Sequence, residues 1–96
     1  MSRLDVGDMI RLQVTFTDFA GQARDPTTVT LRVRKPSGTI VTVSNIQHPT
    51  PGSGVYYADL VLDESGLWRY EWSSTGDLTV VEGGDFYVYR SSVEGG

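Results

Sequence analysis

The single histidine of the chain is the first residue whose type suggests chemistry. His48 lies in a segment rich in proline and glycine, with Ser44 and Ser53 nearby in the sequence and Asp59 farther along. Serine, histidine and aspartate make up a hydrolase triad, but the triad also needs an oriented base and an oxyanion hole. The sequence around His48 indicates neither of them. We therefore interpret His48 as a surface-loop residue, and we expect no catalytic residues and no enzymatic activity.

Pairs of carboxylates are the next candidates, because they serve in glycoside hydrolysis and in calcium binding. They occur at Asp5 and Asp8, at Asp63 and Glu64, and at Glu82 and Asp85. A glycosidase holds two carboxylates across a substrate cleft, for which a chain of 96 residues has little room. The Asp-x-Asp-x-Asp-Gly pattern of a calcium loop does not occur in the sequence. We interpret these residues as solvated loop charges and expect no metal and no cofactor, with a calcium site as the alternative.

The overall composition argues against several classes of function. The chain has no cysteine, so neither disulfides nor thiolate chemistry can contribute. A formal net charge of −4 opposes nucleic-acid binding, which normally needs a basic face. Only Arg32, Arg34 and Lys35 form a short basic cluster. The apolar runs are too short to span a membrane. We therefore expect neither a nucleic-acid partner nor a membrane partner.

The elements that position these side chains are predicted to be β-strands, because apolar and polar residues alternate along most of the chain. About seven short strands are expected, in an all-β, immunoglobulin-like antiparallel sandwich. The clearest ones cover residues 9–17, 28–35, 40–44, 55–63, 67–74 and 80–90. Gly83 and Gly84 predict a bulge in the last of them. Residues 1–90 are expected to form one domain, followed by a flexible C-terminal tail at 91–96.

Aromatic residues at every second position of "GLWRYEW" pose the choice between a ligand platform and a core. Trp68, Tyr70 and Trp72 share one face of the predicted strand. A small domain without disulfides needs large buried groups, so the core is the favoured interpretation. Trp68 also follows an acidic corner, where sandwich domains place an aromatic whose polar edge bonds back to the backbone.

A possible partner-binding surface is indicated by tyrosines on the opposite strand faces. Tyr57, Tyr87 and Tyr89 alternate with core-facing residues and are expected to be exposed. Tyrosine is enriched in interface cores, but exposed tyrosine is also ordinary in cross-strand packing. We predict these three tyrosines as partner-binding anchors, with Arg32 and Arg34 as polar contacts on a neighbouring hairpin.

The order of several short motifs resembles a family of small immunoglobulin-like proteins encoded by tailed bacteriophages and prophages. The motifs are Val-Gly-Asp at 6–8, Phe-Thr-Asp at 16–18, Asp-Pro-Thr-Thr-Val at 25–29, Pro-Ser-Gly-Thr at 36–39, Gly-Val-Tyr-Tyr at 54–57 and Trp-x-Tyr-x-Trp at 68–72. The resemblance extends from about Asp5 to Arg90, and it lies in the order and spacing of the motifs rather than in any one of them.

The resemblance implies a non-enzymatic virion protein that is assembled in the cytoplasm of the host bacterium. Its expected partners are other virion proteins, either on the capsid as a decoration protein or at the neck or tail. Self-association into a homo-oligomer is left open. The alternative is a carbohydrate- or cell-surface-adhesion module, which would use an exposed Trp72 and the tyrosines to stack on sugar rings.

Overall fold

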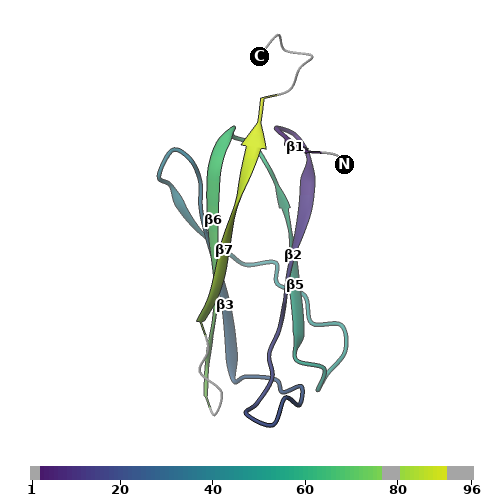
Figure 1. The fold of residues 1–96 in the computed structure, drawn as a ribbon. Coiled ribbons are helices and arrows are strands. Elements are labelled where there is room, and N and C mark those ends of the chain that lie inside the picture. The colour runs from purple at the N-terminus through teal and green to yellow at the C-terminus, as the bar shows by residue number, and fades with distance from the viewer. Residues whose placement is uncertain (1–2, 77–80, 91–96) are drawn as a thin grey trace.

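The computed structural model describes residues 3–76 and 81–90, so the predicted tail at 91–96 lies outside the described residues. The described chain consists of strands joined by turns and loops (Figure 1). The strands are β1 (Leu4–Asp5), β2 (Met9–Thr15), β3 (Thr28–Arg34), β4 (Ile40–Val43), β5 (Val55–Val61), β6 (Gly66–Thr75) and β7 (Val81–Tyr89). The prediction of an all-β chain is confirmed, and six of these strands overlap the segments expected from the alternation.

The strands form two sheets. One has five strands in the order β1-β7-β6-β3-β4, and the other pairs β2 with β5. This arrangement is consistent with the predicted sandwich, and Figure 1 shows the two layers side by side. One pair departs from the expected antiparallel pattern, because β1 runs parallel to β7. Two residues are too few for alternation to indicate a strand, so β1 could not be predicted from the sequence.

The strands predicted at 28–35 and 40–44 form an antiparallel hairpin, β3 and β4. Its strands pair from Leu31 opposite Val43 to Arg34 opposite Ile40. The turn is closed by a 2.9 Å hydrogen bond that the Lys35 backbone nitrogen donates to the carbonyl of Thr39. Gly38 within the turn has φ of +97°, which glycine adopts without steric cost.

The core lies between the facing sheets and is built from the inward residues of both. Its buried hydrophobic members are Leu12, Val14, Phe16, Leu31, Val33, Val43, Ala58, Leu62, Trp68, Trp72 and Val88. Trp68 is 0% exposed and Trp72 is 1% exposed, which confirms the core interpretation of both. Trp68 Nε1 donates a 3.0 Å hydrogen bond to the carbonyl of Glu64, as expected for a corner aromatic. Tyr70 is only partly buried, at the margin of this core.

The bulge predicted at Gly83 and Gly84 is wrong. The pairing of β6 with β7 is continuous, with Tyr70 opposite Gly84 and Glu71 opposite Gly83. The Tyr70 side chain instead explains the glycine opposite it, because a Cβ at Gly84 would lie 2.7 Å from the Tyr70 hydroxyl. Glycine in a strand can mark a close approach as well as a bulge, and here the close approach is the cause.

Candidate functional site

The outer face of the five-stranded sheet carries four of the five predicted partner-binding residues. Arg32 and Arg34 point outward from β3, on the same side of the sheet as Glu71 and the other exposed residues of β6. Tyr87 and Tyr89 are exposed on β7, two strands away. The fold therefore places these four residues on one surface, although β3 and β7 are far apart in the sequence.

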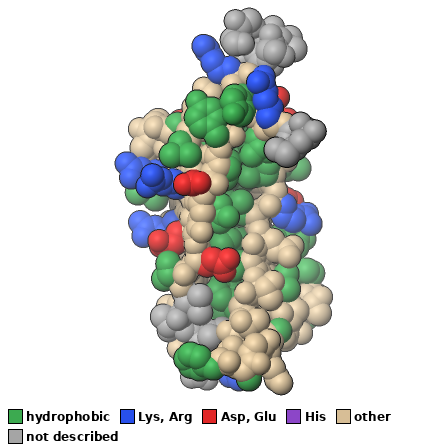
Figure 2. All heavy atoms as spheres, viewed as in Figure 1, with side chains coloured by type: hydrophobic (Ala, Val, Ile, Leu, Met, Phe, Trp, Pro, Cys, Tyr) green, Lys and Arg blue, Asp and Glu red, His purple; other side chains and the backbone are tan. Residues whose placement is uncertain are grey.

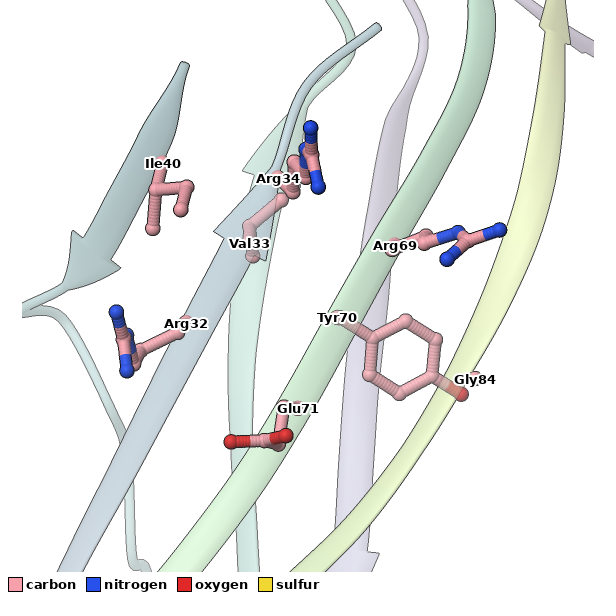
Figure 3. Close-up of a pocket in the computed structure, with 8 residues that line it drawn as sticks. All are labelled: Arg32, Val33, Arg34, Ile40, Arg69, Tyr70, Glu71 and Gly84. Atoms are coloured by element: carbon pink, nitrogen blue, oxygen red, sulfur yellow. The ribbon is translucent and has the colours of Figure 1, made fainter. Parts of the chain in front are cut away.

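Three arginines form what we call the arginine rim: Arg32, Arg34 and Arg69. Arg34 on β3 lies directly opposite Arg69 on β6, and Arg32 lies one row away, opposite Glu71. Figure 3 shows the Arg32 side chain extending toward β4 and that of Arg69 extending toward β7. The guanidinium groups thus spread around the middle of the sheet and do not converge on one point.

A shallow hollow of about 290 Å³ lies within the rim (Figure 3). It is lined by Arg32, Val33, Arg34, Ile40, Arg69, Tyr70, Glu71 and Gly84. Ile40 is an exposed aliphatic side chain on the edge strand β4. Positive and aliphatic side chains therefore meet at one place on the outer face, at the margin where Tyr70 is partly buried.

An aromatic patch adjoins the rim and consists of Leu67, Tyr87 and Tyr89. Leu67 lies directly opposite Tyr87 in the β6–β7 ladder. These side chains are 43%, 54% and 44% exposed, respectively. The two tyrosine rings meet edge to face at 4.9 Å, and the guanidinium carbon of Arg3 lies 4.8 Å from the Tyr89 ring centre. Figure 2 shows hydrophobic side chains gathered over the upper part of this sheet, with basic side chains beside them.

Tyr57 is separate from this surface, because it belongs to β5 in the two-stranded sheet. The prediction that Tyr57 is exposed is wrong, because it is half-buried and the guanidinium carbon of Arg11 lies 3.9 Å from its ring centre. Arg11 is held there by a 2.8 Å ion pair with Asp59, which raises the pKa of Arg11 and lowers the pKa of Asp59 through their mutual hydrogen bond. The backbone of Tyr57 also exchanges two hydrogen bonds with the backbone of Gln47, at 2.7 and 3.0 Å. Tyr57 is therefore held mainly by contacts within its own sheet.

His48 occupies a separate cluster that joins two loops. Its Nδ1 lies 2.8 Å from the carbonyl of Val55, and its Nε2 lies 3.0 Å from a carboxylate oxygen of Asp25. The ring also stacks on Tyr56 at 4.1 Å. Backbone amides of Gly52 and Gly54 donate to the same carboxylate at 2.6 and 2.8 Å. With both ring nitrogens engaged in these bonds, His48 has none left to accept a proton from a nucleophile.

The charge state of this cluster follows from its partners. The hydrogen bond to the Val55 carbonyl, followed by the bond to Asp25, raises the pKa of His48. Hydrogen bonds from the amide of Gly52, and then from Gly54 and His48, lower the pKa of Asp25. Both partners of the ring are acceptors, so the geometry suits an imidazolium that carries a proton on each nitrogen. The cluster can therefore act as an ionic clamp between the loops.

The described residues show no metal-type cluster, since no three or more histidine, aspartate and glutamate side chains gather there. Within 3–76 and 81–90, no helix is long and apolar enough to cross a bilayer. No protein-family model matches the sequence, and no curated protein matches it either.

Sequence reasoning missed three residues of the outer face: Arg69, Leu67 and Ile40. The alternation in "GLWRYEW" already turns Leu67 and Arg69 away from the core. Their place beside Tyr87 and Arg34 depends on the register between strands, which the alternation within one strand does not give. Ile40 begins the predicted strand at 40–44, but its exposure follows from its position on the edge strand.

Proposed function

We propose that this chain is a non-enzymatic binding module of the immunoglobulin-like class, which docks onto other proteins through the outer face of its five-stranded sheet. The docking face and the motif resemblance together lead us to propose that the partners are virion proteins of a tailed phage and that the chain is located in the virion. Decoration of the capsid is the first form of this proposal, and attachment to the neck or tail is the second.

The immunoglobulin-like class is supported by three features of the fold. The strand order is β1-β7-β6-β3-β4 facing β2-β5, which divides the chain between the sheets as such domains do. A corner aromatic, Trp68, bonds back to the backbone of Glu64 just before β6. Buried residues from both sheets share one core. The strand order and the shared core extend the sequence argument without depending on the motifs that suggested the family.

The observation that carries the binding function is the combination of exposed aromatic and arginine side chains on one sheet face. Interface cores are enriched in tyrosine and arginine, and the energetically dominant residues of interfaces come from the same types. Tyr87, Tyr89 and Leu67 supply apolar area, while the arginine rim supplies charged donors around it. The fold alone requires none of these large side chains to face solvent.

The alternative of carbohydrate adhesion is weakened by the position of Trp72. An exposed tryptophan was expected to stack on sugar rings, but Trp72 is 1% exposed and belongs to the core. Tyr87 and Tyr89 remain accessible, although their rings contact each other edge to face. We therefore place protein binding ahead of carbohydrate binding.

The test is co-sedimentation of the purified chain with particles of the encoding phage that lack it. We expect saturable binding, and a copy number matching the capsid lattice would indicate decoration, whereas a few copies per particle would indicate the neck or tail. The double variant Tyr87→Ala/Tyr89→Ala should lose binding. The control is Met9→Ala/Val61→Ala, which removes exposed apolar groups from the outer face of the other sheet. Absence of any binding by the wild-type chain would refute the proposal.

A further inference from the structure

The basic residues of the chain divide into those with an acidic partner and those without one. Of the eight lysines and arginines, ion pairs within the described residues join Arg3 to Asp5, Arg11 to Asp59, Arg24 to Asp18 and Lys35 to Asp63. Arg32, Arg34, Arg69 and Arg90 have no such ion pair in this part of the chain. Three of these four, Arg32, Arg34 and Arg69, are the residues of the arginine rim.

Acidic neighbours are present at the rim but are not used. Arg32 lies opposite Glu71, and Arg69 lies opposite Asp85, yet no ion pair joins either couple in the described structure. Arg34 and Arg69 oppose each other directly, an arrangement of like charges that destabilises a sheet. The guanidinium donors therefore remain available, at a cost to the isolated domain.

We propose that the arginine rim receives the carboxylate side chains of an acidic protein segment, while the aromatic patch beside it covers an apolar residue of the same segment. This inference rests on the proposed binding function and adds the chemistry of the partner. Each guanidinium offers a planar fork of donors that pairs with a carboxylate through two parallel hydrogen bonds. Arginine also retains its charge on burial, so it suits a contact that excludes water.

Charge complementarity favours an acidic protein over a longer polyanion. The formal net charge of −4 repels nucleic acid and other densely charged polymers at a distance. Glu71 and Asp85 lie within the same face and oppose an anion whose charge is continuous along its length. A protein segment can place single carboxylates against single arginines and still bury an apolar side chain against Leu67 and Tyr87.

The experiment uses the whole chain and two matched variants. Arg34→Gln/Arg69→Gln removes two charges from the rim, and Arg11→Gln/Arg24→Gln removes two charges elsewhere. Each protein is titrated with an acidic peptide whose glutamates are spaced around a leucine, Glu-Ser-Leu-Ser-Glu, and with heparin at about 50 and about 300 mM NaCl, and is co-sedimented with the phage particles. The thermal midpoint of each variant is recorded to show that it is folded.

We expect the rim variant to lose at least roughly tenfold in affinity for the acidic peptide and for the particles, with the control variant unchanged. Undiminished particle binding by the rim variant would overturn this inference while leaving the proposed function in place. If the wild-type chain does not bind particles, the proposed function fails, and the titration with the acidic peptide alone decides the inference. Preference for heparin over the acidic peptide, lost in the rim variant, would overturn the protein partner in favour of an anionic glycan.

Discussion

The two buried tryptophans should respond differently to the same substitution. Trp68 and Trp72 lie on the same face of β6, and both are almost completely buried. Trp68 Nε1 donates to the carbonyl of Glu64, whereas Trp72 Nε1 is buried without a hydrogen-bond partner in the described structure. We predict that Trp68→Phe clearly lowers the free energy of unfolding and that Trp72→Phe lowers it far less or raises it.

The magnitudes follow from the volume lost and from the hydrogen bonds. Replacing indole by phenyl removes roughly 40 Å³ of buried volume, which at about 24 cal/mol per Å³ costs about 1 kcal/mol at either position. Loss of the Trp68 hydrogen bond adds about 1 kcal/mol, giving a destabilisation of about 2 kcal/mol. At Trp72 the substitution removes a buried donor whose burial costs about 1–3 kcal/mol, so the net effect lies between about zero and a stabilisation of about 2 kcal/mol.

Urea unfolding at neutral pH measures both effects, because each variant retains one tryptophan as its fluorescence probe. Far-ultraviolet circular dichroism provides a second probe of the same transition, and coincident curves would justify a two-state treatment. The predicted difference in unfolding free energy between the variants is about 2–4 kcal/mol. Equal destabilisation by the two substitutions, or a larger loss for Trp72→Phe, would refute the hydrogen-bond argument.

Two further predictions concern the loops that hold the sheets together. The ionic clamp of His48 and Asp25 should stabilise the fold most between about pH 4 and 6.5. The raised pKa of His48 means that its contribution is fully present below the ordinary value of 6.5 and is lost as pH rises through the folded-state value. The lowered pKa of Asp25 means that its contribution is present above 3.8 and is lost on further acidification. Urea midpoints measured across this range should fall on the alkaline side, and His48→Gln should flatten that fall; an unchanged profile in the variant would contradict the clamp. Separately, Gly54→Ala should destabilise by more than about 2 kcal/mol, because φ is +71° and a Cβ would overlap a backbone carbonyl of the neighbouring segment. Gly38→Ala is its control, since φ is +97° and nothing lies within 4 Å, and similar losses in both variants would leave backbone strain as the sole cause.

The direction in which each strand residue faces could be predicted from the sequence. Alternation along β2 and β6 assigned Leu12, Val14, Trp68 and Trp72 to the core, and all four are buried. This succeeds because successive strand residues point to opposite faces, so a local pattern determines orientation. The same reasoning placed Tyr87 on an exposed face, although it could not say what would lie beside it.

Contacts between distant segments could not be predicted in this way. The opposition of Arg34 and Arg69 depends on the register of β3 against β6, and a shift by one residue would reverse the faces. The pairing of His48 with Asp25 joins loops 23 residues apart, and no periodic pattern marks either partner. The glycine pair in β7 was misinterpreted for a similar reason, because the Tyr70 ring that covers Gly84 comes from another strand.

Hydroxyl residues elsewhere on the same outer face indicate that the fold does not require the arginines. Farther along β3 and β6, Thr30 lies opposite Ser73 and Thr28 lies opposite Thr75, so neutral hydroxyl residues occupy the outward positions there. Hydroxyl side chains at Arg34 and Arg69 would fit the same pleat without repulsion between like charges. Arg34 and Arg69 instead face each other next to the exposed tyrosines, and within the described residues no ion pair with Glu71 or Asp85 offsets their repulsion. A residue choice that costs stability is explained by contacts made outside the chain, which is why we propose a partner for this end of the sheet.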